Sequence, residues 1–130
     1  MIFVDSSVWI DYINRNNTPH TEKLDSILGV QGIVIGDLVL AEVLQGCSDP
    51  RIFKETVRLF GLAEFVVIGG YRVSLAAARN YITLRSKGIT VRKTIDTLIA
   101  TRCIINDYEL LHSDRDFLPF EEHLGLKCVL

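Results

Sequence analysis

Hydrophobic and polar positions along the chain repeat with two different periods. Short runs that are mostly apolar alternate with longer segments in which apolar residues recur every three or four positions. The first pattern is typical of buried strands and the second of amphipathic helices. The predicted strands cover residues 2–4, 33–35, 63–68, 110–112 and 127–130. The predicted helices cover residues 6–14, 19–28, 38–46, 51–60, 71–87 and 94–106, with a short turn or helix at 116–123.

Residues that start helices stand at several of these boundaries. Thr18-Pro19 and Asp49-Pro50 suit helix starts, because proline is tolerated in the first turn of a helix. Asp37 precedes the third helix, and an aspartate there is a favoured N-cap. These signals support the boundaries that the periodicity predicts.

The alternation of helices with strands that are apolar throughout predicts the fold class. Such strands form a parallel sheet that is buried on both faces, so the chain is expected to be α/β. We expect three layers, α/β/α, with a central parallel sheet of about five strands. A chain of 130 residues is most simply one domain, covering residues 1–130. Ligands of such sheets bind beyond the C-terminal ends of the strands.

The composition of the chain indicates which partners and which cellular compartment are expected. Hydrophobic residues make up 48% of the chain and the mean hydropathy is +0.27, which suggests apolar surface that another protein chain covers. No apolar run is long enough to span a membrane, and the N-terminus has no leader pattern, so a cytoplasmic protein is expected. The net charge is −2, whereas a protein that holds nucleic acid by charge alone is basic.

Three cysteines are present, and none of them has the spacing of a metal site. Cys47, Cys103 and Cys128 form no CxxC or CxxH motif, which argues against zinc, and their odd number argues against a disulfide framework. Each lies among apolar neighbours, so buried, reduced thiols are expected.

Four carboxylates stand where strands end, where a helix begins or alone on an apolar helix. Asp5 follows the first strand, Asp114 follows the fourth, and Asp96 opens the last long helix. Each of these three has a structural explanation, because aspartate caps helices and suits their first turn. Glu42 is harder to explain in this way, since the four residues before it and the two after it are apolar. Its position is either the rim of a pocket or a narrow exposed stripe of a mostly buried helix. A cluster of oxygen ligands for Mg²⁺ or Mn²⁺ explains all four together.

Four sequence motifs that contain these residues resemble those of PIN-domain ribonucleases, especially the VapC-type toxins of toxin–antitoxin pairs. The motifs occur in the order of that family and span essentially the whole chain. They are Phe3-Val4-Asp5-Ser6-Ser7-Val8-Trp9-Ile10-Asp11, Leu40-Ala41-Glu42-Val43-Leu44-Gln45-Gly46, Thr94-Ile95-Asp96-Thr97-Leu98-Ile99-Ala100 and Leu111-His112-Ser113-Asp114-Arg115-Asp116-Phe117.

The resemblance implies a function and a set of site residues. Asp5, Glu42, Asp96 and Asp114 would be the acidic residues that hold Mg²⁺ or Mn²⁺, with Asp116 as an accessory member. Ser6 would be a neighbouring polar support. The chain would then be a metal-dependent endoribonuclease that cleaves RNA by attack of a metal-activated water. The resemblance also implies a homodimer and a cognate antitoxin, a segment of which fills the acidic groove.

Basic residues precede the third motif. Arg92 and Lys93 are either a solvated loop or a rim that positions substrate phosphates beside the metal site. If Asp5 and Asp96 bind the metal directly, Glu42 and Asp114 would orient water molecules. No histidine is needed as a general base.

Other classes of protein fit the motifs less well. A phosphatase of the haloacid dehalogenase type needs Asp-x-Asp on its first strand, where this chain has Asp5-Ser6-Ser7. A response-regulator receiver needs an aspartate after its third strand, which here is followed by Gly69-Gly70. Two alternatives stay open: a non-toxic PIN-domain nuclease that processes RNA, and a non-catalytic module that dimerises or binds a partner.

Overall fold

A five-stranded parallel sheet forms the centre of the computed structural model, which describes residues 1–130. The strands lie in the order β3-β2-β1-β4-β5, and every neighbouring pair is parallel. Their bounds are β1 Ile2–Val4, β2 Ile33–Gly36, β3 Glu64–Val66, β4 Glu109–Leu111 and β5 Lys127–Cys128. The predicted α/β class and the sheet of five parallel strands are confirmed.

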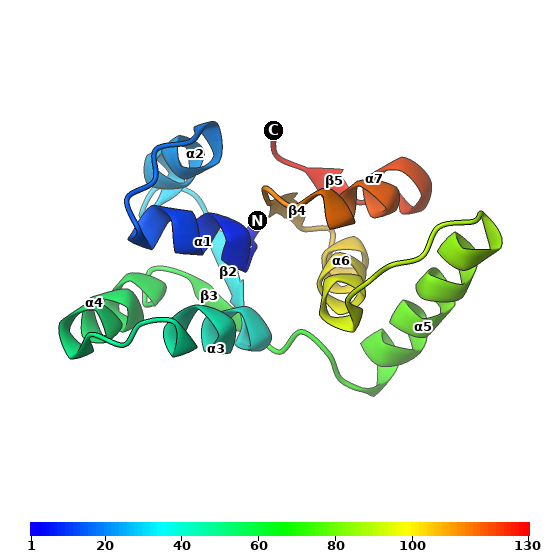
Figure 1. Ribbon diagram of the computed structural model, residues 1–130, viewed down its shortest axis with the longest axis horizontal. Coiled ribbons are helices and arrows are strands. Elements are labelled where there is room, and N and C mark those ends of the chain that lie inside the picture. Colours follow the sequence, from blue (N-terminus) through cyan, green and yellow to red (C-terminus); the bar gives the residue numbers. More distant parts are fainter.

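Helices cover both faces of this sheet. They are α1 Ser6–Ile13, α2 Pro19–Ile27, α3 Asp37–Gln45, α4 Pro50–Phe60, α5 Tyr71–Ser86, α6 Thr94–Asn106 and α7 Leu118–Leu124, with a 3-10 helix, η1, at Arg115–Phe117. Figure 1 shows α1 to α4 gathered around β1, β2 and β3, α6 and α7 beside β4 and β5, and α5 on the outer side of α6. The chain moves outward from β1 to β3 and then returns to β4, so right-handed connections place the two helix groups on opposite faces. None of the helices combines the length and apolar composition that crossing a membrane would require.

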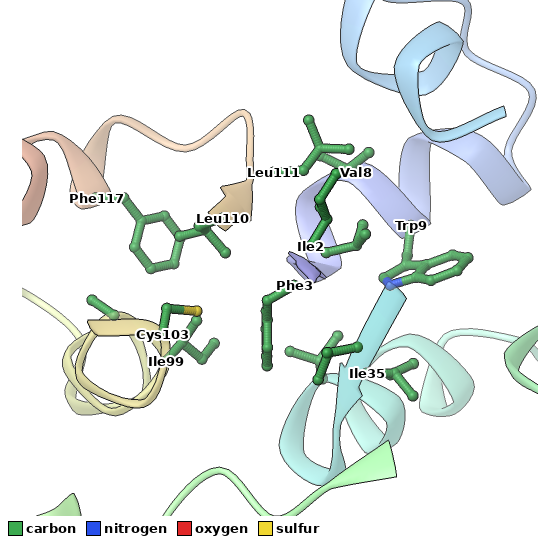
Figure 2. Packing of buried hydrophobic residues seen from close by; sticks show 14 of the residues in the cluster. Ile2, Phe3, Val8, Trp9, Ile35, Ile99, Cys103, Leu110, Leu111 and Phe117 are labelled. Carbon is green, nitrogen blue, oxygen red and sulfur yellow. The ribbon is translucent and has the colours of Figure 1, made fainter. Parts of the chain in front are cut away.

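One hydrophobic core lies between the helices and the central strands. Phe3 of β1 is fully buried, and Figure 2 shows its ring between Ile35 of β2 and the α6 side chains Ile99 and Cys103. Trp9 of α1 is also fully buried and meets Phe60 edge to face, with ring centroids 5.0 Å apart. This packing fixes the starts of α1 and α6 against the central strands.

The third strand is shorter and more exposed than the sequence predicts. β3 ends at Val66 instead of residue 68, because the backbone of Ile68 makes other hydrogen bonds. Its N–H donates to Asp37 Oδ1 (2.9 Å), and its carbonyl accepts from Arg102 Nε (3.0 Å). As the edge strand, β3 also leaves Phe65 57% exposed, so the prediction that every strand is buried is wrong here.

Smaller corrections concern caps and cysteines. Gly36, not Asp37, is the N-cap residue of α3, and Asp37 is the first helical residue. Thr18 and Asp49 cap α2 and α4 as expected, in each case with proline in the first turn. All three cysteines are unpaired, and only Cys103 is fully buried. The last strand stops at Cys128 instead of residue 130.

Candidate functional site

The ends of β1 and β4 bring two of the predicted carboxylates to one place. These strands are neighbours in the sheet, and Asp5 N–H donates to the carbonyl of Leu111 at the end of β4 (3.0 Å). The chain leaves β1 and β4 toward opposite faces of the sheet, which creates a crevice at their C-terminal ends. Asp5 and Asp114 both line it, as their positions after strands predicted.

Asp5 is held by a serine that the sequence did not single out. Its Oδ2 accepts hydrogen bonds from the backbone N–H of Ser7 (3.1 Å) and from the Ser7 hydroxyl (2.6 Å), so Asp5 caps α1. Ser7 Oγ also accepts from the N–H of Ser113 (3.2 Å). Ser7 therefore connects Asp5 to the loop that carries Asp114. The predicted support, Ser6, lines the pocket beside it.

Asp96 is a buried acid of the site with an unpartnered oxygen. It lies in the first turn of α6, is 5% exposed, and its Oδ2 is buried without any hydrogen-bond partner. Burial, followed by the charges of Asp114 and Asp5, raises its pKa to about 6. Burial also raises the pKa of Asp5, despite its hydrogen bonds to Ser7. Neither carboxylate forms an ion pair.

The loop after β4 shapes the other side of the pocket. Asp114 Oδ1 accepts from the N–H of Asp116 (2.9 Å) and so caps the short helix η1. The N–H of Asp114 donates to Nδ1 of His112 (3.1 Å), and the His112 ring packs on Phe117 at 4.9 Å between centroids. Burial lowers the pKa of His112, which keeps that nitrogen free to accept. His112 is thus hydrogen-bonded locally and orders the Asp114 loop.

Five acidic residues meet, but in two overlapping sets. Carboxylate oxygens of Asp96, Asp114 and Asp116 lie within 4.8 Å of one another, close enough to share one ion. Asp5 and Glu42 fall outside that group but line the same pocket as Asp96 and Asp114, which has a volume of about 180 Å³. Glu42 reaches the pocket from the middle of α3, where it is half-buried.

The two basic residues that were predicted to contact substrate, Arg92 and Lys93, differ in the positions of their side chains. Lys93 lines the pocket, and its charge counteracts the rise in the pKa of Asp96. The Arg92 side chain is 77% exposed and is bound to the carboxylate of Asp116, with Nη2 at 2.9 Å from Oδ1 and 3.2 Å from Oδ2. Sequence spacing gave no sign of this ion pair, because Arg92 and Asp116 come from separate loops.

The residues present fit a hard divalent cation. The three clustered acids all offer carboxylate oxygen, which is the donor that Mg²⁺ and Mn²⁺ prefer. The unpartnered Asp96 Oδ2 is a buried acceptor that a cation would satisfy. No cysteine or histidine joins the group, so the donors do not suit zinc.

Comparison with solved structures shows the same fold in several bacterial proteins. VapBC2 from Rickettsia felis, solved bound to a DNA fragment from its promoter, has a TM-score of 0.78 at 18% identity, over 99% of this chain and 98% of that one. FitAcB from Neisseria gonorrhoeae has a TM-score of 0.77 at 14% identity, over 100% and 97%. VapC20 from Mycobacterium tuberculosis, a sarcin–ricin loop cleaving toxin, has a TM-score of 0.67 at 17% identity, over 91% and 93%.

The family assignment comes from the sequence itself. No curated protein matches the chain significantly. A family model described as the PIN domain matches residues 2–121, a range that contains the four acidic motifs and the whole sheet except β5. The chain therefore belongs to the PIN-domain family, as its motifs indicated.

Proposed function

We propose that the protein is an endoribonuclease that depends on Mg²⁺ or Mn²⁺ and is the toxin of a toxin–antitoxin pair in the cytoplasm. The observation that carries this proposal is the meeting of acidic side chains from four separate segments in one pocket of a PIN-domain chain. Structural relatives include a toxin that cleaves RNA and complexes named VapBC, which supports the assignment.

Each acidic residue has a distinct part in this proposal. Asp96 is the central ligand, because it belongs to the three clustered acids and also faces Asp5 across the pocket. Asp5 and Asp96 would hold the cation directly, Asp116 would be an accessory ligand beside Asp96, and Glu42 and Asp114 would orient water. A divalent ion bound there lowers the pKa of a water molecule and neutralises charge on the phosphoryl oxygens. Hydrolysis then forms a bond from the water oxygen to phosphorus and breaks the bond to the leaving ribose oxygen.

The substrate is expected to be held at the pocket rim. Lys93 and the hydroxyl of Ser6 both line the pocket and are placed to contact a phosphate beside the acids. The pocket is otherwise acidic, so RNA binds productively only when a cation neutralises it. This requirement links substrate affinity to metal concentration.

Cleavage of a total-RNA pool tests the nuclease. The purified protein should cut RNA with Mn²⁺ or Mg²⁺ and stop when chelator is added, and Asp96→Asn should be inactive. Glu55→Gln is the matched control, because Glu55 is an exposed acid on α4 outside the pocket. Cleavage that survives chelation or the Asp96 substitution would rule out the proposal and favour the non-catalytic module.

The proposed antitoxin has a groove to occupy. A cavity of about 230 Å³ between α1, α3 and α4 shares Ile10 and Glu42 with the acidic pocket. Ile13, Val43 and Ile52 make much of its wall apolar, and no lysine or arginine lines it. A segment with apolar side chains and a basic residue that reaches Glu42 complements this groove.

Growth assays separate a toxin from an RNA-processing nuclease. Expression of the wild-type chain should arrest growth, and co-expression of the antitoxin should restore it. Ile52→Lys should keep cleavage but lose rescue, because it places charge in the apolar groove away from the acids. A chain that cleaves RNA without harming growth would identify the non-toxic alternative.

A homodimer is proposed from an apolar stripe on α5. Tyr71, Leu75, Ala78 and Ile82 follow helical spacing on one exposed face, with Tyr71 84% and Ile82 65% exposed. Such a stripe is usually covered by another chain. Light scattering after size exclusion should give a dimer, and Ile82→Lys should give a monomer. A monomeric wild-type chain at high concentration would contradict the dimer.

A further inference from the structure

Arg92 makes an ion pair with one of the three clustered acids. Its Nη2 lies 2.9 and 3.2 Å from the two oxygens of Asp116, so a single nitrogen bridges the carboxylate. The pair joins the loop between α5 and α6 to the short helix η1 across the rim of the acidic pocket. Asp116 is only 16% exposed at this position.

The same carboxylate is needed for the cation. An oxygen of Asp116 lies within 4.8 Å of oxygens from Asp96 and Asp114, so these three can close around one ion. Both oxygens of Asp116 are within hydrogen-bond distance of the guanidinium. A divalent cation and a guanidinium on one carboxylate repel each other, so the two ligands of Asp116 compete.

The ion pair is weak enough to be displaced. Arg92 is 77% exposed, and exposed ion pairs stabilise a protein only slightly because water and salt screen them. Val91, the residue before Arg92, is buried and holds the backbone in place, so only the side chain needs to move. Lys93 on the other side lines the pocket, which keeps Arg92 close to the acids after release.

We propose that Arg92 is an internal competitor of the metal: it neutralises Asp116 until a divalent cation displaces it, and the released guanidinium then binds a phosphate of the RNA. The role in RNA binding rests on the proposed nuclease function, whereas the competition for Asp116 does not. Arg92 acts on the cation through Asp116 and is therefore a positioning residue. Because Arg92 competes for Asp116, a higher concentration of the divalent cation is needed to occupy the metal site.

Calorimetric titration of Mn²⁺ into the 130-residue chain at 0.15 M ionic strength tests the competition. Arg92→Gln should bind Mn²⁺ about two- to fivefold more tightly than the wild type, the range expected for removing an exposed ion pair. Arg115→Gln is the matched control, because it removes the same charge from the residue next to Asp116, yet Arg115 makes no ion pair. Its affinity for Mn²⁺ should stay close to that of the wild type.

The possible outcomes separate this inference from the nuclease proposal. Unchanged or weaker Mn²⁺ binding by Arg92→Gln overturns the competition while leaving a metal-dependent nuclease intact. Equal tightening by Arg92→Gln and Arg115→Gln also overturns it, because the effect would then be general charge. A wild-type chain that binds no Mn²⁺ at all would remove both the competition and the proposed metal-dependent function.

A second titration tests the released side chain. Binding of a fluorescent phosphonate analogue of RNA, in which a methylene group replaces the leaving ribose oxygen so that hydrolysis is blocked, is measured by anisotropy with and without Mn²⁺. Arg92→Gln should weaken binding clearly when Mn²⁺ is present and little when it is absent, because the wild-type guanidinium is then engaged by Asp116. Equal weakening in both conditions would show that Arg92 is always free, which contradicts the inference.

Discussion

The two helices that carry acids into the pocket, α3 and α6, present them in opposite ways. Asp96 stands in the first turn of α6, is almost completely buried, and has an oxygen without a partner. Glu42 stands in the middle of α3 and is half-buried at the junction of two cavities. The first position costs the protein stability unless a cation is bound, whereas the second leaves the carboxylate in contact with water.

Both helices are tied to the same short segment. Asp37 in the first turn of α3 accepts a hydrogen bond from the N–H of Ile68, and Arg102 of α6 donates to the carbonyls of Ile68 (3.0 Å) and Gly69 (3.0 Å). The chain between β3 and α5 therefore spaces α3 from α6. Asp96 and Glu42 therefore differ in how deeply their side chains are buried. The segment that both helices contact sets the distance between α3 and α6.

The largest expected difference between the helices is in catalysis. Asp96→Asn should lower the cleavage rate about 100-fold or more, because loss of a direct ligand removes several kcal/mol of charge stabilisation. Glu42→Gln should lower it about tenfold, since a residue that only orients water contributes less. Initial rates on one RNA at saturating Mn²⁺ check this. An equal loss of rate in both variants would show that Asp96 and Glu42 do not differ in their contribution to catalysis.

Burial of Asp96 also predicts a pH dependence of stability. Its pKa of about 6 in the folded protein lies above the ordinary 3.8, so folding favours the protonated carboxyl. The stability that this supplies is complete below about pH 4 and is lost as pH rises to 6. Asp96→Asn, which stays neutral, should therefore exceed the wild type at pH 7.5 by up to about 3 kcal/mol in free energy of unfolding.

Urea unfolding in the presence of chelator measures that difference. The two proteins should be equally stable at pH 4, and added Mn²⁺ should stabilise only the wild type, because ligands stabilise the state that binds them. A variant less stable than the wild type at pH 7.5 would mean that Asp96 has a favourable partner, which would contradict the contrast with Glu42.

A glycine at the start of α3 tests how closely that helix is packed. A Cβ at Gly36 would overlap the buried side chain of Ile68 and lie 3.0 Å from Cζ of Phe3. Gly36→Ala should therefore cost about 1–3 kcal/mol in free energy of unfolding, as overpacked cores do. Gly46→Ala is the control, because its Cβ would meet only Val43 O at 3.5 Å. Similar values for both would show that α3 can shift freely.

The smallest expected effect on stability concerns the hydrogen bond between Asp37 of α3 and Ile68, in the segment between β3 and α5. Asp37→Ala removes the acceptor for the N–H groups of Leu38 and Ile68, and should cost about 1–2 kcal/mol in free energy of unfolding. Asp37→Asn keeps an amide oxygen and should cost less than half as much. Urea denaturation at pH 7.5 compares the two. If alanine and asparagine cost the same, the contact with Ile68 does not depend on this acceptor.

Much of the fold and the meeting of the acids followed from local patterns. Asp5 and Asp114 were predicted to meet because both follow buried strands, and parallel strands end at one edge of a sheet. Glu42 was singled out because charge is costly among apolar neighbours. These inferences need only periodicity and the order of elements, which the sequence displays directly. The roles of these residues in metal binding stay predictions.

Other features depend on contacts between segments that periodicity does not describe. The early end of β3 results from hydrogen bonds that Asp37 and Arg102 make to Ile68. The sequence of residues 63–68 does not indicate these hydrogen bonds. The choice of Ser7 over Ser6 as the partner of Asp5 depends on the first turn of α1. The pairing of Arg92 with Asp116 depends on two loops whose paths the sequence leaves open.

The pairing of β1 with β4 has a consequence for synthesis of the protein. β1 begins at Ile2, yet one of the two strands beside it begins at Glu109, so this pair joins segments that are far apart in the sequence. Proteins are made from the N-terminus, and a strand cannot pair before its neighbour has left the ribosome. Asp5 therefore cannot meet Asp96 and Asp114 until the ribosome has made β4. Until then a nascent chain carries only separate pieces of the acidic pocket.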